Sequence, residues 1–428
     1  MSIPLLIFIL AFVSIFVFRI PISLGMIAAS IFYVLAKGLD LGLIAEKILS
    51  NLYAKDIILA VPLFIFTANV MNTSKVTNLI FEFANTLVGR WRGGMGHVNV
   101  LASLIFSGMT GSAVADASGL GVMEIQAMRE AGYDDDFSCA ITAASATIGP
   151  IFPPSIPMVF YAMLSSTSIG SLFMAGMTPG IIMAIALMLY IAAIAGKRKY
   201  PYGPKYSTKQ FLLNTLRAIP ALLTPVILLI GIYTGIVTPT EAGALAAFYG
   251  ILISVLIYHS LGPKEMWKVL VDTVKATGSL SLIVGAAYTV AYVVAVEHIA
   301  DMVAGLILSF TQNKYVLLMV INIMFFILGM FIDTSTITLV FVPMVLPLAQ
   351  QLGIDLVHLG VVIVLNMMIG LLTPPFGVLL FITSGISDTP LRGIIREVWP
   401  MIGVLVAVLL LITYVPEVAL WVPHTFFK

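Results

Sequence analysis

Two helix-breaking patterns rich in Gly, Ser, Thr and Pro lie inside strongly apolar sequence, and each occurs twice in this chain of 428 residues. The first copy covers Ser107–Gly121 and Ala146–Tyr161, and the second, at an offset of 221 residues, covers Leu328–Val342 and Met367–Phe381. Gly and Pro interrupt helices and leave carbonyl groups without partners. In a bilayer, unwound backbone persists only where protein buries it or water reaches it. Matched interruptions in two halves therefore indicate the binding site of a membrane transporter.

The two copies share the residues that fix where each break falls. The identical pairs are Gly108 and Gly329, Met109 and Met330, Gly132 and Gly353, Asp134 and Asp355, Gly149 and Gly370, and Pro153-Pro154 and Pro374-Pro375. A single motif of this kind is typical of a kink in a membrane helix. Each copy, however, contains a Gly-x-x-x-Pro-Pro break whose Gly follows Gly108 or Gly329 by 41 residues. This pairing favours a site over a kink.

The groups released at these breaks suit ions of both signs. Freed carbonyls and hydroxyls are ligands for a small hard cation such as Na⁺, whereas the N-terminal ends of half-helices attract anions. Asp333 lies at the second break, where the first half has Ser112. We predict that it binds a ligand or an ion, because an acid at mid-membrane depth needs a partner. Asp116 follows the first break and fits a ligand role or a helix N-cap equally well.

The composition excludes an ordinary water-soluble fold. Hydrophobic residues make up 60% of the chain and charged residues 10%, with a mean hydropathy of +1.10. The apolar stretches suffice for roughly ten to twelve spans. A net charge of +1 without any long basic run argues against nucleic acid as a partner. Cys139 is the only cysteine, which excludes an intramolecular disulfide, and the first apolar stretch reads as a retained helix and not a signal peptide.

Periodicity and punctuation divide the chain into two similar halves. Helices are predicted at 3–18, 21–37, 57–72, 75–88, 98–130 (broken), 136–164 (interrupted near Gly149–Pro154), 170–195, 217–237, 240–259, 277–295, 300–311, 315–348, 357–386 and 396–415. Residues 1–195 form the first repeat and 211–428 the second. The basic segment 196–210 between them is predicted to be a cytoplasmic linker by the positive-inside rule. An odd number of crossings in each half would make the repeat inverted.

Other polar residues receive structural interpretations. The run Asp134–Asp136 precedes an apolar stretch and predicts an N-cap. Glu241 sits at a helix start, where Glu is favoured, and indicates a structural or subunit-interface role. His97, His298 and His358 are scattered and indicate no metal site.

At these residues the sequence resembles the large membrane (M, DctM-like) subunit of the tripartite ATP-independent periplasmic (TRAP) transporters. The matching stretches are Phe106–Asp116, Gly149–Pro157, Thr238–Gly243 and Leu371–Gly377. The resemblance implies a multi-pass, all-α protein of the bacterial inner membrane, an elevator-type inverted repeat with two re-entrant hairpins and broken helices. It also implies two partner proteins, a separate small four-helix membrane subunit and a periplasmic substrate-binding protein. The implied cargo is an organic acid, of the sialic acid or C4-dicarboxylate type, driven by Na⁺ and without an organic cofactor.

Site residues are carried over from the resemblance by motif. Substrate is expected near Ser112, Ser155 and Asp333. Two or more Na⁺ ions are expected, the first near Ser103, Ser107, Gly108 and Gly149 and the second near Gly329, Gly370 and Thr373. Phe152 stands where the second half has Thr373, so the first site lacks a hydroxyl at that point.

Three alternatives to this function remain open. A stand-alone Na⁺-coupled carrier would transport without a binding protein. An intramembrane enzyme would need motifs that the sequence lacks, such as His-Glu-x-x-His or Gly-x-Ser-x-Gly, so no enzymatic activity is predicted. A purely structural membrane subunit would not need two matched breaks.

Overall fold

The structure is a computed structural model that describes residues 2–18, 20–53, 56–310 and 312–426. The described elements are all helical, apart from an isolated bridge between Arg92 and Tyr202. The first half contains α1 (Ile3–Phe18), α2 (Ile22–Ala36), α3 (Gly42–Tyr53), η1 (Asp56–Leu59), α4 (Ala60–Thr73), α5 (Val76–Val88), α6 (Gly94–Thr110), α7 (Ala113–Glu130), α8 (Asp135–Ala146), α9 (Ile156–Ser165) and α10 (Ile169–Ala195).

The second half follows after the linker and repeats this order. It contains α11 (Thr208–Tyr233), α12 (Pro239–Leu252), η2 (Ile253–Ile257), α13 (Pro263–Val296), α14 (Ile299–Phe310), α15 (Lys314–Phe331), α16 (Thr334–Gln351), α17 (Leu356–Leu372), α18 (Val378–Ser387), α19 (Leu391–Tyr414) and α20 (Glu417–Phe426). The predicted breaks are confirmed, because the chain leaves the helix at Gly111–Ser112, between α8 and α9, at Ile332–Asp333 and between α17 and α18.

Several helical segments differ from the sequence prediction, among them α11, which was predicted to begin at residue 217 but begins at Thr208. The short helices α3 and α20 were not predicted, since neither is long enough to span a bilayer. The helix α13 was predicted to begin at residue 277 but begins at Pro263. Its first turns carry charged residues, including Lys264, Glu265 and Lys268, so hydropathy alone overlooks them.

Seven of the described helices are long and apolar enough to cross a membrane singly. A further seven apolar helices are only 10–17 residues long and include α9, α17 and α18. A single crossing needs about 20 residues. The single spans are therefore fewer than the roughly ten to twelve predicted from apolar stretches, because several of those stretches fold as hairpins or broken helices.

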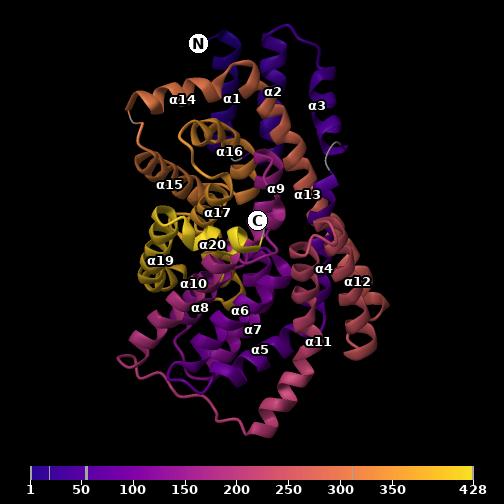
Figure 1. Ribbon diagram of the computed structural model, residues 1–428, viewed down its shortest axis with the longest axis vertical. Helices are drawn as coiled ribbons and strands as arrows, with labels where there is room; N and C mark the ends of the chain where they lie inside the picture. Colours follow the sequence, from indigo (N-terminus) through magenta and orange to yellow (C-terminus); the bar gives the residue numbers. More distant parts are fainter. Residues whose placement is uncertain (1, 19, 54–55, 311, 427–428) are drawn as a thin grey trace.

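The two halves exchange contacts in a reciprocal way. Around the helix breaks, α9 of the first half packs against α16 of the second half, and α18 of the second half packs against α7 of the first. The earlier helices do the same, with α2 against α13 and α12 against α4. Figure 1 shows the hairpin α6–α7 in the lower part of the molecule and the hairpin α15–α16 in the upper part. The fold is an inverted repeat whose hairpins approach the centre from opposite ends.

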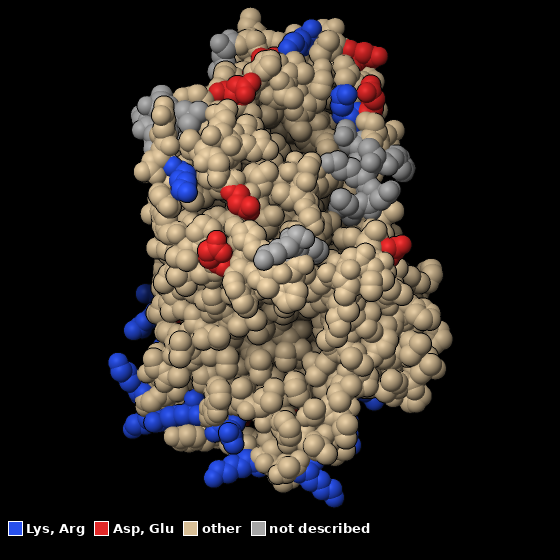
Figure 2. Space-filling model, in the orientation of Figure 1, with Lys and Arg blue, Asp and Glu red and all other residues tan. Residues whose placement is uncertain are grey.

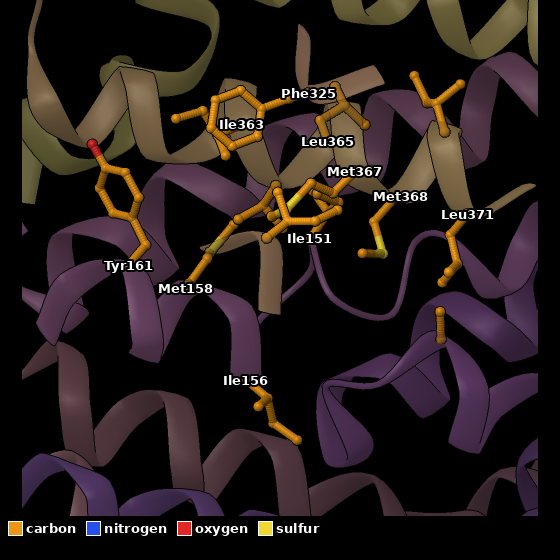
Figure 3. Packing of buried hydrophobic residues seen from close by; sticks show 14 of the residues in the cluster. Ile151, Ile156, Met158, Tyr161, Phe325, Ile363, Leu365, Met367, Met368 and Leu371 are labelled. Carbon is orange, nitrogen blue, oxygen red and sulfur yellow. The ribbon is translucent and has the colours of Figure 1, made fainter. Parts of the chain in front are cut away.

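The core is organised around α17. Its residues from His358 to Leu372 are all buried, as expected for a helix surrounded by protein on every side. In Figure 3, Phe325 of α15, Met367 of α17 and Met158 of α9 belong to one packed cluster. The second-half broken helix is thereby held against elements of both repeats.

Charge is distributed unevenly along the long axis. Lys and Arg gather at the lower end of the face shown in Figure 2, whereas the Asp and Glu residues visible there lie higher. Figure 1 shows that the linker between α10 and α11 runs along this lower end.

Candidate functional site at the helix breaks

The breaks of both repeats line one cavity. Its volume is about 180 Å³. The lining residues are Gly111, Ser112, Ala113 and Val114 at the first tip, Pro150, Ile156 and Pro157 at the first broken helix, Asp333, Thr334 and Ser335 at the second tip, Met368 and Leu371 of α17, and Leu280 of α13. The structure thus brings Ser112 and Asp333, 221 positions apart in sequence, to the same space.

Ser112 and Asp333 perform the same local task at the two tips. The Ser112 hydroxyl accepts a hydrogen bond from the Ala115 backbone N–H (3.3 Å) and caps α7. The Asp333 carboxylate accepts from the backbone N–H groups of Ser335 (3.0 Å) and Thr336 (3.1 Å), and also from the Thr336 hydroxyl. It caps α16. Side-chain caps at both breaks explain why the helices restart there.

Ser155 caps the third helix that begins at the cavity. Its hydroxyl accepts from the Met158 N–H (3.2 Å) and donates to the Pro150 carbonyl. Ser155 itself is fully buried, and the neighbouring Ile156 and Pro157 form the cavity wall instead. Its hydroxyl therefore positions α9, and substrate contact at this point would come through its neighbours.

Three helix N-termini, those of α7, α9 and α16, therefore end at this cavity. The first N–H groups of a helix have no partner inside the helix, and the macrodipole makes that end partially positive. Asp333 is the one charged residue among the described residues that line the cavity. An oxyanion can be bound here by backbone N–H groups without a basic side chain.

The residues predicted for the second Na⁺ ion lie together. Gly329 and Gly370 bring α15 and α17 into backbone contact, because a Cβ on Gly370 would lie 2.7 Å from the Gly329 Cα. Thr373 follows directly and is buried, and its hydroxyl donates to the Ile369 carbonyl (2.6 Å). That bond uses the hydroxyl proton and leaves oxygen lone pairs available. Neutral oxygens of this kind suit Na⁺, but the Na⁺ role itself stays a prediction.

The residues predicted for the first Na⁺ ion are more dispersed. The Ser103 hydroxyl donates to Ser145 (3.2 Å), and the Ser107 hydroxyl donates to the Leu104 carbonyl (2.6 Å). Gly108 faces Pro225 and Phe152, whereas Gly149 faces the backbone of the first tip. No contact recorded for the described residues joins Ser103 to either glycine. This ligand set also stays a prediction.

One of the two roles that the sequence left open for Asp116, that of a helix N-cap, is wrong. Asp116 is not an N-cap, since Ser112 holds that position and Asp116 lies within the first turn of α7. The sequence reasoning also overlooked Glu124, which is buried in the same helix. An acidic residue inside a membrane hairpin is itself a functional signal and could have identified it.

Two structural interpretations are confirmed. Asp134 caps α8 by accepting from the Phe137 N–H (3.1 Å), and Asp355 does the same for α17. Thr238 and Glu241 form a reciprocal capping box at the start of α12. These acids cap helices outside the cavity, whereas Asp333 caps a helix at the cavity itself. Asp116 and Glu124 are buried acids of α7 that cap no helix.

Comparison with known proteins identifies similar chains. A family model described as "Tripartite ATP-independent periplasmic transporter, DctM component" matches residues 8–418. The chain is 40% identical over 407 residues to the sialic acid TRAP transporter large permease protein SiaM of Vibrio cholerae, with 95% of each chain covered. It is 38% identical to the C4-dicarboxylate TRAP transporter large permease protein DctM of Pseudomonas aeruginosa, with 86% of each covered.

A longer relative and a solved structure extend the comparison. The isethionate TRAP transporter permease protein DctMQ of Oleidesulfovibrio alaskensis is 33% identical over 94% of this chain and 64% of its own length. The crystal structure of the Alcanivorax borkumensis YdaH transporter, described as having an unusual topology, superposes with a TM-score of 0.62. It covers 90% of this chain and 88% of that one at 14% identity, and so supports the fold alone.

Proposed function

Because this chain belongs to the DctM component family of tripartite ATP-independent periplasmic transporters, we propose that it imports an organic acid in symport with Na⁺. It is the large permease subunit of such a system. The observation that carries the proposal is the convergence of three helix N-termini from both repeats on one cavity. That arrangement offers backbone N–H groups to an anion.

The names of the relatives favour the same chemical class. They describe permeases for sialic acid, C4-dicarboxylates and isethionate. All three are organic anions with at least one carboxylate or sulfonate group. We propose that an oxyanion of the substrate lies at the N-termini of α7 and α16, near Ser112 and Asp333, with the wall at Ile156 positioned by Ser155.

Na⁺ supplies positive charge to this site in the proposed mechanism. An anion close to the Asp333 carboxylate is repelled by it. Backbone carbonyls at Gly329 and Gly370 and the Thr373 hydroxyl would hold one Na⁺ ion, and the residues around Ser103, Ser107, Gly108 and Gly149 a second. Asp333 would then accept hydrogen bonds from substrate hydroxyl or amine groups or act through the cation.

Movement follows an elevator scheme in this proposal. The hairpins and broken helices α6–α9 and α15–α18 form most of the cavity wall. The outer helices that contact them include α4, α5, α13 and α14. We propose that this inner unit slides against the outer helices, with α13 contributing Leu280 to the cavity from the stationary side.

The orientation in the inner membrane follows from charge. The lower end, with its Lys and Arg residues and the linker 196–210, is assigned to the cytoplasm by the positive-inside rule. An impermeant thiol reagent added to intact cells should then fail to label Ser207→Cys in a Cys139→Ser background. Labelling before the cells are opened would contradict this orientation.

Reconstitution tests the function. Proteoliposomes should contain this chain, a small four-helix membrane subunit and a periplasmic binding protein loaded with sialic acid or a C4-dicarboxylate. We expect uptake that needs an inward Na⁺ gradient and the binding protein. Equal uptake with choline replacing Na⁺ would contradict the coupling, and uptake by the chain alone would identify a stand-alone carrier.

A further inference from the structure

A groove on the surface of the first repeat is not used by the proposed substrate site. Its volume is about 430 Å³, and its wall is one face of α10, with Ile185, Met188 and Leu189. Residues three and four positions apart share a helix face. Ile185 precedes Ala195, the last residue of α10, by ten residues, roughly 15 Å along the helix. That is about half of a hydrocarbon core about 30 Å thick. The groove therefore has the depth of one membrane leaflet.

Aromatic and polar side chains line the other part of this groove. Trp91 is 45% exposed and packs against His97 in a T-shaped arrangement, with ring centroids 5.3 Å apart. His97 is only 3% exposed, and its Nδ1 atom is buried without a hydrogen-bond partner in the protein. Tryptophan is enriched where membrane proteins meet the membrane surface. A buried polar atom without a partner requires an explanation, and a ligand in the groove supplies one.

Arg92 adds a positive charge to the polar part of the groove. Its Nη2 donates to the Gly196 carbonyl (3.2 Å), and its guanidinium lies 6.0 Å from the centre of the Tyr202 ring. Both partners belong to the linker, which runs along the basic lower end of the molecule (Figures 1 and 2). No ion pair among the described residues involves Arg92, and the nearby acid Glu397 pairs with Arg198 instead (2.6 Å). The guanidinium therefore keeps its charge and further donors for an anion.

The second repeat lacks this combination of charge and groove. At the offset of 221 residues, His97 corresponds to Leu318, which lines a groove of its own. That groove is smaller, about 160 Å³, and is lined by both Lys314 and Asp355, so that an acid balances the basic residue. None of the described residues that line the groove of the first repeat is acidic. The hairpin architecture therefore does not require an unpaired arginine at this place, and Arg92 serves something other than packing.

We propose that this groove binds an anionic phospholipid, whose phosphate contacts Arg92 and whose acyl chain lies along Ile185 and Leu189. The ester groups would lie between them, beside Trp91 and His97. The polarity of the groove thus changes in the same order as that of one phospholipid. Basic pockets between membrane helices on the cytoplasmic side bind anionic headgroups, and the orientation assigned above places the groove in that leaflet. This site is separate from the transport function proposed above and does not depend on Na⁺ coupling.

The site lies at a junction between the two repeats. The loop after α5 connects an outer helix to the first hairpin, and the linker after α10 connects the two halves. A hydrogen bond from the Gly93 N–H to the Pro201 carbonyl (3.1 Å) and the bridge between Arg92 and Tyr202 hold these two segments together. A phospholipid held by Arg92 would therefore stabilise the junction.

A lipid titration that compares headgroups tests the proposal. The full chain is purified in detergent and titrated with phosphatidylglycerol, or with phosphatidylcholine of the same acyl chains, and bound lipids are counted by native mass spectrometry. We expect phosphatidylglycerol to bind roughly tenfold more tightly, because its net negative charge is attracted by the unpaired guanidinium. Arg92→Gln should lose this preference. Arg396→Gln is the matched control, since Arg396 is also exposed and precedes Glu397, which pairs with the linker, and it should keep the preference.

Two further arms separate the acyl chain from the headgroup. Leu189→Trp places a larger side chain in the groove and should weaken the binding of both lipids. Glycerol phosphate has the phosphate without acyl chains and should not displace phosphatidylglycerol at equal concentration. Equal affinity for the two lipids, a preference that persists in Arg92→Gln, or displacement by glycerol phosphate would overturn the lipid site.

The wild-type chain provides a measurement that does not depend on the variants. A structure of the chain with its small subunit, determined in nanodiscs that contain phosphatidylglycerol, should show acyl-chain density along α10 that leads to Arg92. A helix of the small subunit in the groove, or ordered lipid only at other places on the surface, would overturn the proposal.

Discussion

The two hairpins share a backbone plan but place their acids in opposite positions. The first, α6–α7, has a neutral Ser112 at its tip and two buried acids, Asp116 and Glu124, behind it. The second, α15–α16, has Asp333 at the tip and the apolar Ile337 and Val345 at the positions that match the two buried acids. Both tips are capped and both restart a helix. The repeat therefore determines where the helices break, whereas the placement of charge differs between the halves and indicates a division of chemical tasks.

The broken helices differ in a related way. Ser155 is buried and caps α9, while the corresponding Phe376 is exposed and contacts Phe331 through its ring, with centroids 5.4 Å apart. In the interior of the second half, the Asn366 side-chain amide donates to the Asn322 carbonyl oxygen, a pair of neutral groups. Among the described residues of the second half, no Asp or Glu is fully buried, and Asp333 is the acid that lines the cavity.

Removal of the tip acid should have the largest effect on transport. We expect Asp333→Ala to lose most uptake, at least about tenfold, while copurifying normally with the small subunit, because an acid that faces the cavity serves the ligand and not the packing. Asp333→Asn separates charge from capping, since Asn is an equally good N-cap. Partial uptake by the Asp333→Asn variant would indicate that hydrogen bonding by residue 333 matters more for transport than its charge. Full uptake by the alanine variant would reduce Asp333 to a helix cap.

The glycine contact in the second half should be the next most sensitive point. Gly370→Ala would place a Cβ 2.7 Å from Gly329 Cα and should destabilise the chain by about 1–3 kcal/mol. Gly149→Ala, at the corresponding position, should cost less because its nearest contact would be 3.2 Å away. Gly385→Ala is the control, since its Cβ would meet nothing within 4 Å. Thermal unfolding in detergent measures all three, and equal effects at the first two positions would contradict the asymmetry.

Thr373 should affect the cation more than the substrate. We expect Thr373→Ala to raise the Na⁺ concentration for half-maximal uptake several-fold, because a hydroxyl beside freed carbonyls suits Na⁺. Preference among organic acids should not change. Phe152→Thr, at the matching first-half position, asks whether a hydroxyl there strengthens Na⁺ dependence. An unchanged Na⁺ titration for Thr373→Ala would remove that residue from the site.

The smallest effect on stability is expected for substitution of Glu297, which joins the end of α13 to the end of α2 through Lys37. Hydrogen bonds from Lys37, Tyr33 and Ser2 lower the pKa of Glu297 to about 2, from an ordinary value of 4.5. Because the folded-state pKa is the lower one, this stabilisation is complete above pH 4.5 and is lost as the pH falls toward 2. Glu297→Gln should therefore cost about 0.5–1 kcal/mol at neutral pH, since the pair is partly exposed.

The pH dependence of unfolding checks that account. The stability difference between wild type and Glu297→Gln should shrink as the pH is lowered below 4.5. Glu46→Gln, in a more exposed ion pair with Lys47, serves as the control. A difference that stays constant down to the acid limit would contradict the ion-pair origin.

The sequence predicts the features that depend on local chemistry. Gly and Pro located the breaks, Asp134 was predicted as a cap, and the offset of 221 linked Ser112 with Asp333. Features that depend on contact between distant segments were not predictable. The face-to-face packing of Gly329 and Gly370 and the burial of Glu124 arise only when helices meet. The alternative of a cap at Asp116 was wrong, because Ser112 holds the N-cap position and Asp116 is buried in the first turn of α7.

The central claim is that an organic anion binds where the tips of the two repeats meet. A structure of the chain with its small subunit, determined with Na⁺ and a bound sialic acid or C4-dicarboxylate, tests it most directly. We predict density for the substrate in the cavity between Ser112 and Asp333, with an oxyanion at the N-termini of α7 and α16. Substrate bound outside the cavity lined by these two residues would contradict the account.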